Sequence, residues 1–168
     1  MELKEALLKR RSVRKFTEDS VSDDMIDELL HAAMSGPSAC NRRPWAFYVA
    51  KSAEARERLR GISPAARMNA PLAIVVCGNL ELALPEDKQT FWIQDTSAAV
   101  ENILLRATDL GLGACWCGVH PMERAIGKVK EALMLPEHIS PLGLIWIGHP
   151  ADTPEPRDQY DETCVHFV

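Results

Sequence analysis

Several features that commonly identify a protein's activity are missing from this sequence. No run of about 18 apolar residues occurs, so we expect no membrane-spanning segment. The nucleophile elbow G-x-S-x-G, the zinc motif H-E-x-x-H and the phosphate-binding loop G-x-x-x-x-G-K-S/T are all absent. The five histidines are scattered without metal-ligand spacing, and we expect no metal site. If the protein is an enzyme, we therefore expect a cofactor to carry its chemistry.

Positive charge is also scarce. The chain has 19 Lys and Arg residues against 24 Asp and Glu residues, which gives a formal net charge of -5 and a pI near 5.5. An acidic chain without a long basic stripe is a poor partner for nucleic acid. The segment Met1–Glu5 lacks the apolar core of a secretory signal peptide, so we expect a cytoplasmic protein.

The five cysteines are an odd number, and in a cytoplasmic protein we expect them as reduced thiols. Cys115 and Cys117 form a C-x-C pair rather than the C-x-x-C redox motif. On a strand both thiols face the same side, which allows a metal or redox role. Free cysteine also packs well as a small buried hydrophobe. The sequence leaves the roles of this pair and of Cys40 open.

Length predicts one domain over residues 1–168. Periodicity and capping predict helices over 2–10, 23–34, 52–60, 87–110 and 121–133. Apolar runs rich in β-branched and aromatic residues predict strands over 45–50, 72–78, 114–119 and 142–148. The last residues, 163–168, form a further β-like run without a hairpin partner, and such a run often docks elsewhere, for example on another chain.

Capping residues define several helix ends. Ser22 and Ser52 are good N-caps, and Gly111 suits the left-handed position that follows a helix. Pro121 fits the first turn of the helix near it. The segment 87–110 is apolar around most of a helical circumference. We therefore expect this helix either at the centre of the domain or partly covered by a second subunit.

The residues Lys9 to Phe16 concentrate the scarce positive charge. Five cations occupy seven consecutive positions there, and like charges so close together repel unless an anion balances them. Arginines around a serine suit a phosphate, because each guanidinium can bond two oxygens and the hydroxyl adds a donor. Cations at a helix C-terminus also suit the helix dipole, so a solvated helix end is the alternative.

Five segments become more informative when they are taken together and in order. They are Arg10-Arg-Ser12-Val-Arg14-Lys-Phe, Pro37-Ser38-Ala39-Cys-Asn41-Arg-Arg-Pro44-Trp45, Asp95-Thr-Ser-Ala-Ala-Val-Glu-Asn-Ile-Leu-Leu, Gly111-Leu-Gly113 and Leu144-Ile-Trp-Ile-Gly148-His-Pro150. In this order they resemble the FMN-dependent nitroreductase family over essentially the whole chain. The region 61–71 and the helices after Gly118 are shorter than in better-known members, so the resemblance does not predict what covers the flavin.

The resemblance implies an α+β three-layer sandwich, in which helices flank a mixed, mainly antiparallel sheet. It also implies an intertwined homodimer with two FMN molecules. Each FMN would be bound non-covalently in the dimer interface, where both subunits touch it.

The resemblance also implies a set of FMN-binding residues. Arg10, Ser12 and Arg157 are expected at the phosphate, and Arg14 at the N1 and O2 edge of the flavin. A backbone amide near Gly118 is expected to face N5. Arg11 matches the motif without a separate role. The residues expected along the ring from the partner subunit are Pro37, Ser38, Ala39 and Asn41.

The expected activity is that of an NAD(P)H-dependent FMN oxidoreductase. NAD(P)H, as co-substrate, would pass a hydride to N5, and a small acceptor such as a nitroaromatic or a quinone would then be reduced in a ping-pong exchange. No catalytic side chain is expected beyond Arg14, which would stabilise negative charge at N1 and O2. Two alternatives stay open: a family member that uses reduced FMN for dehalogenation or flavin breakdown, and a non-enzymatic flavin-binding or redox-sensing protein.

Overall fold

A four-stranded sheet forms the middle layer of the computed structural model, which describes residues 1–168. In chain order the helices and strands are α1 (Leu3–Lys9), α2 (Asp23–Met34), β1 (Trp45–Ala50), α3 (Ala53–Arg60), β2 (Leu72–Asn79), α4 (Phe91–Asp109), β3 (Gly113–Gly118), α5 (Glu123–Leu133) and β4 (Ile139–Gly148). Short 3-10 turns lie at Ala39–Asn41 (η1), Pro64–Ala66 (η2), Glu86–Lys88 (η3) and Glu162–Cys164 (η4). Every helix expected from the sequence is present, and so is every strand except the C-terminal run.

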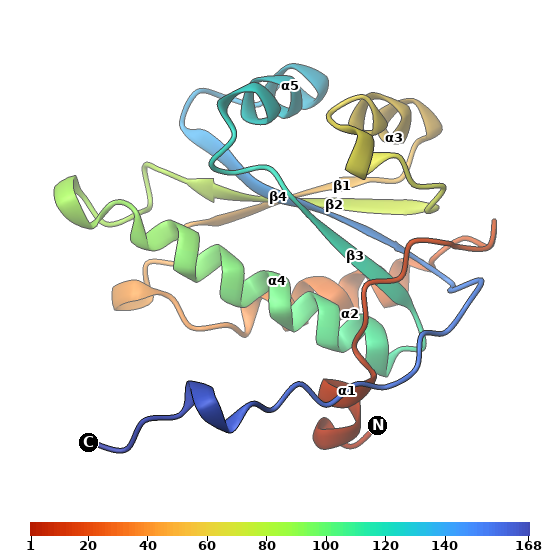
Figure 1. The fold of residues 1–168 in the computed structure, drawn as a ribbon. Helices are drawn as coiled ribbons and strands as arrows, with labels where there is room; N and C mark the ends of the chain where they lie inside the picture. The colour runs from red at the N-terminus through yellow and green to blue at the C-terminus, as the bar shows by residue number, and fades with distance from the viewer.

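The strand order is β1-β2-β4-β3, so β1 and β3 are the two edges of the sheet. All three strand pairs are antiparallel, and the parallel component is a single bridge between Ser12 and Ala114 at the outer edge of β3. Helices α2 and α4 lie on one side of the sheet, and α3 and α5 lie on the other (Figure 1). The predicted α+β three-layer sandwich with a mainly antiparallel sheet is confirmed.

The two central strands are apolar along their length because helices cover both of their faces. Alternate residues of β2 enter different cores, with Ile74 in the core beside α4 and Val75 in the core beside α5. On β4, Ile145 and Trp146 divide in the same way. Since successive side chains of a strand point to opposite faces, a doubly covered strand needs an unbroken apolar run.

Helix α4 is central to the layer that it shares with α2. Its side chains are buried or half-buried except for Phe91, Gln94 and Glu101, and it contacts α1, α2 and the sheet. The chain itself therefore covers most of this helix, as its apolar circumference predicted. The helix begins at Phe91 rather than at 87, because Glu86–Lys88 form a 3-10 turn with hydrogen bonds to the third residue back. No helix, α4 included, is both long and apolar enough to cross a membrane.

Three predicted caps are confirmed. The hydroxyls of Ser22 and Ser52 accept backbone N–H groups from the residues three positions further on. Gly111 has a φ of 74° and follows α4 in the left-handed conformation that glycine adopts without strain.

Two expectations about segment ends are wrong. Pro121 lies outside a helix, because α5 begins at Glu123 after a turn in which the Met122 N–H donates to the Val119 carbonyl at 3.0 Å. The run over 163–168 is not a strand; it overlaps η4 and is exposed throughout. A strand needs backbone partners, and the C-terminal arm lies away from the sheet (Figure 1).

The basic stretch leaves α1 and runs along the outer edge of β3 (Figure 1). The Val13 N–H donates to the Ala114 carbonyl at 3.0 Å, and an isolated bridge joins Phe16 to Pro150. Any Cβ at Gly113 would lie 2.7 Å from Val13 Cγ1, so this approach requires glycine. The sheet therefore holds the backbone on which the predicted phosphate residues lie.

Replacing Gly113 with alanine tests this docking. Overpacking of this kind costs about 1–3 kcal/mol of unfolding free energy. We expect Gly113→Ala to lower the midpoint of urea unfolding followed by circular dichroism. As a matched control, Gly127→Ala in α5 places a methyl group that meets no atom within 4 Å, and it should raise the stability by about 0.5–1 kcal/mol. A Gly113→Ala protein as stable as the parent would contradict the close approach.

Candidate functional site

The docked stretch presents a row of polar groups along β3. Val13 is 7% exposed and packs into the core, whereas Ser12 and Arg14 are exposed. Residues two apart in extended backbone share a side, which places these two together. An Arg14 guanidinium N–H donates to the Ser12 carbonyl at 3.4 Å. The row begins at Arg10, which caps the C-terminus of α1.

Three arginines meet where α1 approaches the C-terminal arm. The Arg157 backbone N–H donates to the Leu8 carbonyl at 3.0 Å, and the Arg11 guanidinium donates to the carbonyl of Glu155. Arg10, Arg11 and Arg157 line a hollow of about 390 Å³. The fold thus brings together Arg10 and Arg157, both predicted at a phosphate, and adds Arg11, for which no separate role was predicted. Ser12 is not among the residues that line this hollow.

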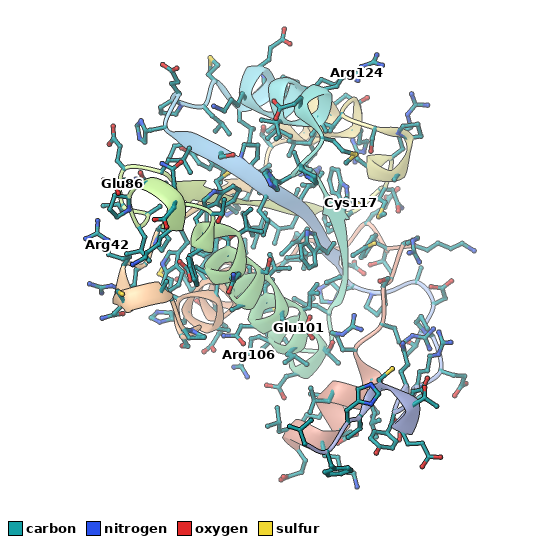
Figure 2. All side chains as sticks on the ribbon, turned by 60° about the vertical axis from the view of Figure 1, so that its left-hand side comes forward. Arg42, Glu86, Glu101, Arg106, Cys117 and Arg124 are labelled. Carbon is teal, nitrogen blue, oxygen red and sulfur yellow. The ribbon has the colours of Figure 1, made fainter.

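A carboxylate from α4 lies beside this arginine cluster. Glu101 Oε1 is 3.4 Å from Arg10 Nε, and both side chains are partly exposed. Figure 2 shows Glu101 on the surface of α4, in its C-terminal half. An exposed ion pair of this kind contributes only about 0–1 kcal/mol, because water screens it. A dianionic ligand could therefore replace Glu101 at Arg10 at a cost of only about 0–1 kcal/mol, the contribution of the ion pair that it breaks.

The other end of the polar row borders the thiols of β3. Ser12 lies near Cys115, since its backbone pairs with Ala114, and the charge of Arg14 acts on both Cys115 and Cys117. A hydrogen bond from Cys117, assisted by Arg14 and Ser12, lowers the pKa of Cys115 to about 7 against the effect of its burial. Gly118 ends the strand, is exposed, and has no atom within 4 Å of the place a Cβ would occupy. A flat ligand could approach the backbone there.

The loop from Pro37 to Asn41 lies at the other end of α4. The Ala39 N–H donates to Oδ1 of Asp95, which is 6% exposed in the first half of that helix. The Ser38 hydroxyl accepts the Arg43 N–H at 2.9 Å. Asn41 has a φ of 53°, a left-handed conformation that asparagine tolerates better than most residues. These bonds give the loop a defined shape.

One chain does not bring the two predicted halves of the site together. The loop lies beside the start of α4, whereas the arginines lie beside its C-terminal half and β3 (Figure 1). The residues placed apart from Arg10 and Arg14 in this way are Pro37, Ser38, Ala39 and Asn41. Their contribution from a partner subunit stays a prediction.

Two residues that hold these segments were not predicted from the sequence. Asp95 lies on the same face of α4 as Trp92 and Ala99, three positions before it and four after it, and a carboxylate on an apolar helix face is a signal for a buried acid that needs a hydrogen-bond donor. Glu101 gave no such signal. Its contact with Arg10 depends on how α1 packs against α4, which periodicity does not encode.

The matches to known proteins follow the same segments. Residues 7–66 and 61–149 match a family model described as the nitroreductase family. The chain belongs to the nitroreductase family. The family that the ordered segments indicated is therefore confirmed.

Relatives of this nitroreductase-family chain span it almost from end to end. A Methanothermobacter thermautotrophicus protein, provisionally named NADH dehydrogenase/NAD(P)H nitroreductase, is 42% identical over 169 residues, which cover 99% of this chain and 87% of the relative. A Bacillus subtilis protein named FMN reductase (NADPH) is 26% identical over 180 residues, which cover 96% of this chain and 71% of the relative.

Solved structures agree with the nitroreductase fold. A Parabacteroides distasonis structure, provisionally named NADH dehydrogenase/NAD(P)H nitroreductase, superposes with a TM-score of 0.92 at 37% identity, over 98% of this chain and 96% of that chain. A Desulfovibrio desulfuricans structure, provisionally named a nitroreductase and solved in complex with FMN, has a TM-score of 0.84 at 28% identity over 100% of this chain and 97% of that chain.

Removing the Asp95 carboxylate tests how the Pro37–Asn41 loop is held. Asp95→Ala leaves the Ala39 N–H without its acceptor, and a hydrogen bond to a charged group contributes about 1.5–3 kcal/mol. We expect a lower unfolding free energy and faster proteolytic cleavage within residues 37–43. Asp95→Asn keeps an acceptor oxygen, so its unfolding free energy should fall less and its cleavage within residues 37–43 should be slower than in Asp95→Ala. Equal losses in the two variants would show that this hydrogen bond does not hold the loop.

Proposed function

We propose that this nitroreductase-family protein is an NAD(P)H-dependent FMN oxidoreductase, which passes electrons to a small acceptor such as a nitroaromatic or a quinone in a ping-pong exchange. The observation that carries the proposal is the meeting of Arg10, Arg11 and Arg157 in one hollow of an acidic protein. Clustered guanidinium groups suit a phosphate dianion, which accepts two hydrogen bonds from each fork. The names of the relatives point to the same cofactor and co-substrate.

The chemistry of the donors fits the parts of FMN. The arginine cluster offers fixed positive charge for the phosphate. Two carboxylates, Glu101 and Asp158, line the same hollow, and Glu101 forms a weak, partly exposed ion pair with Arg10. At the other end of the polar row, exposed Gly118 offers backbone rather than a side chain. Arg14 lies in the row as a permanent cation. The groups suited to the FMN phosphate and the groups suited to its flavin ring are thus separated along the outer edge of β3.

The protein's part in this reaction is to bind, orient and stabilise charge. FMN, when bound, supplies the chemistry by accepting a hydride from NAD(P)H and passing electrons to the acceptor. Arg10, Arg11 and Arg157 would hold the phosphate and so fix the position of the ring. Arg14 would stabilise negative charge at the N1 and O2 edge, and a backbone N–H near Gly118 would donate toward N5.

A homodimer that completes each site is part of the proposal. In one chain the loop Pro37–Asn41 contacts α4 at Asp95, in its first half, whereas the arginine row contacts it at Glu101, in its second half. Large apolar side chains are also exposed on α1 and at the C-terminus, with Leu3 68%, Leu7 54% and Phe167 97% exposed. Such residues need a covering surface, and a second copy of the chain offers one that a closed two-fold dimer can use.

The first test is the colour and redox behaviour of the purified protein. We expect a yellow protein whose flavin is released by denaturation and identified as FMN. Addition of NAD(P)H without oxygen should bleach the flavin. A nitroaromatic or a quinone added afterwards, with no more NAD(P)H, should reoxidise the flavin and restore the colour. Colourless protein that takes up no added FMN would overturn the proposal.

The arginine variants provide the control for that test. Arg10→Ala and Arg157→Ala each remove a charge-assisted contact, so FMN affinity measured by fluorescence quenching should fall by about 10- to 100-fold. Arg124→Ala removes the same charge from α5, in the layer on the other side of the sheet (Figure 2), and should leave the affinity unchanged.

Mixing two defective variants tests whether each site is shared. Arg10→Ala/Arg14→Ala breaks the arginine row, and Ser38→Ala/Asn41→Gly breaks the loop while glycine keeps the left-handed backbone at 41. Refolded together, the two variants should recover about a quarter of the parent activity, since random pairing makes half of the dimers mixed and each mixed dimer has one intact site. No recovery in demonstrably mixed dimers would contradict a site built from both subunits.

A further inference from the structure

The segment that joins α3 to β2 (Figure 1) forms one side of a hollow that the proposed FMN contacts do not use. The hollow has a volume of about 540 Å³ and is lined by Glu57, Arg60, Gly61, Arg67, Met68 and Asn69. Two of these residues are cations and one is an anion, in a chain whose net charge is -5. An excess of fixed positive charge in a hollow suits an anionic group of a ligand.

Arg67 is the unpaired charge of this hollow. Its side chain is exposed and forms no hydrogen bond or ion pair within the chain, whereas its backbone N–H donates to the Pro64 carbonyl at 3.3 Å. A guanidinium is permanently charged and presents parallel N–H donors that match a phosphate. A ligand can therefore bind Arg67 without first breaking a contact in the protein.

Arg60 is fixed by its neighbours. Its Nε donates to the Met68 carbonyl at 2.7 Å, and its Nη1 donates to Glu57 Oε2 at 2.9 Å. Its guanidinium carbon lies 5.6 Å from the centre of the Trp146 ring. These bonds use Nε and Nη1 and leave Nη2 for a ligand. Because Arg60 balances Glu57, the charge of Arg67 is the net charge of the hollow.

The backbone on both sides of Arg67 is tied to other parts of the fold. The Cys117 thiol donates to the Ala65 carbonyl at 3.4 Å, and the Asn69 side-chain amide donates to the Phe16 carbonyl at 3.0 Å. The first contact joins the segment to the end of β3, and the second joins it to the end of the basic stretch. Arg67 lies between these two contacts, so its position along the segment is defined.

These contacts place the hollow beside the proposed position of the flavin ring. Cys117 directly precedes Gly118, and Phe16 follows Arg14 by two residues. Gly118 and Arg14 are the groups that we propose at the ring. A hydride donor stacked on the ring must extend its other parts past the ring, and the phosphate groups of NAD(P)H lie in those parts.

We propose that this hollow binds the 2′-phosphate of NADPH and that Arg67 thereby sets a preference for NADPH over NADH. The inference rests on the proposed function, in which NAD(P)H is the hydride donor. The two co-substrates differ at one position of the adenosine ribose, which carries a hydroxyl in NADH and a phosphate in NADPH. A carboxylate typically accepts that hydroxyl, whereas an arginine accommodates the phosphate. Here the carboxylate of Glu57 is paired with Arg60 and the unpaired charge is Arg67, which favours the phosphate.

Nucleotide fragments test the hollow without hydride transfer. The probes are adenosine 2′,5′-bisphosphate, which carries the 2′-phosphate, and adenosine 5′-monophosphate, which lacks it. Calorimetry measures their binding to the purified protein. We expect the bisphosphate to bind about 10- to 100-fold more tightly, as one charge-assisted contact allows. Equal affinities, or no binding of the bisphosphate, would overturn the proposal.

Variants of Arg67 assign that difference in affinity to its side chain. Arg67→Ala should remove most of the difference, and Arg67→Lys should keep part of it, because lysine keeps the charge but not the planar fork. Arg58→Ala is the matched control, since Arg58 is an exposed arginine of α3 that does not line the hollow; both affinities should stay unchanged. An Arg67→Ala protein with the full difference, or equal effects of Arg67→Ala and Arg58→Ala, would contradict the role of Arg67.

Steady-state kinetics separate this inference from the proposed function. The parent should have a lower KM for NADPH than for NADH. Arg67→Ala should raise the KM for NADPH by about 10- to 100-fold, with little change in kcat or in the KM for NADH, because the lost contact is uniform binding remote from the reacting carbon. Equal KM values in the parent would overturn the role of Arg67 and leave the flavin function standing. A protein that takes up no FMN but still prefers the bisphosphate would overturn the flavin function and leave the phosphate site standing.

Discussion

The backbone pairing between Val13 and Ala114 is the constraint on which the proposed site depends. It holds an extended, strongly basic segment against the edge of the sheet. Without this pairing, the like charges of the segment would repel one another and favour a more open arrangement. Gly113 makes the approach possible because it has no side chain. Once Val13 is buried, Arg10 must lie at the end of α1, and Ser12 and Arg14 must face away from the core.

Helix α4 connects the parts of the molecule that the site needs. It is buried by the sheet on one side and by α1 and α2 on others, so its polar residues occupy fixed positions. Asp95 near one end holds the Pro37–Asn41 loop, and Glu101 further along meets Arg10. A rigid helix about 1.5 Å long per residue thus keeps the two groups of residues apart within one chain. This separation is the physical reason for proposing that two chains build each site.

Arg14 is the permanent cation of the docked stretch on the side away from the core. In the proposed function its charge would favour a reduced, negatively charged flavin edge. The same charge acts on the neighbouring Cys115 thiol and helps to lower its pKa. Negative charge is therefore favoured at this edge of the sheet.

Local sequence determined most of the secondary structure. Helix and strand positions, the caps at Ser22 and Ser52 and the glycine after α4 followed from side-chain periodicity and neighbouring backbone groups, because these interactions act over a few residues. The family and the basic stretch also followed from ordered motifs. Tertiary structure alone decided the start of α5, the exposed C-terminal arm, the meeting of Arg11 with Arg157, and the holding roles of Asp95 and Glu101. Those contacts join segments far apart in the chain, and packing of the whole fold selects them, which no local pattern records.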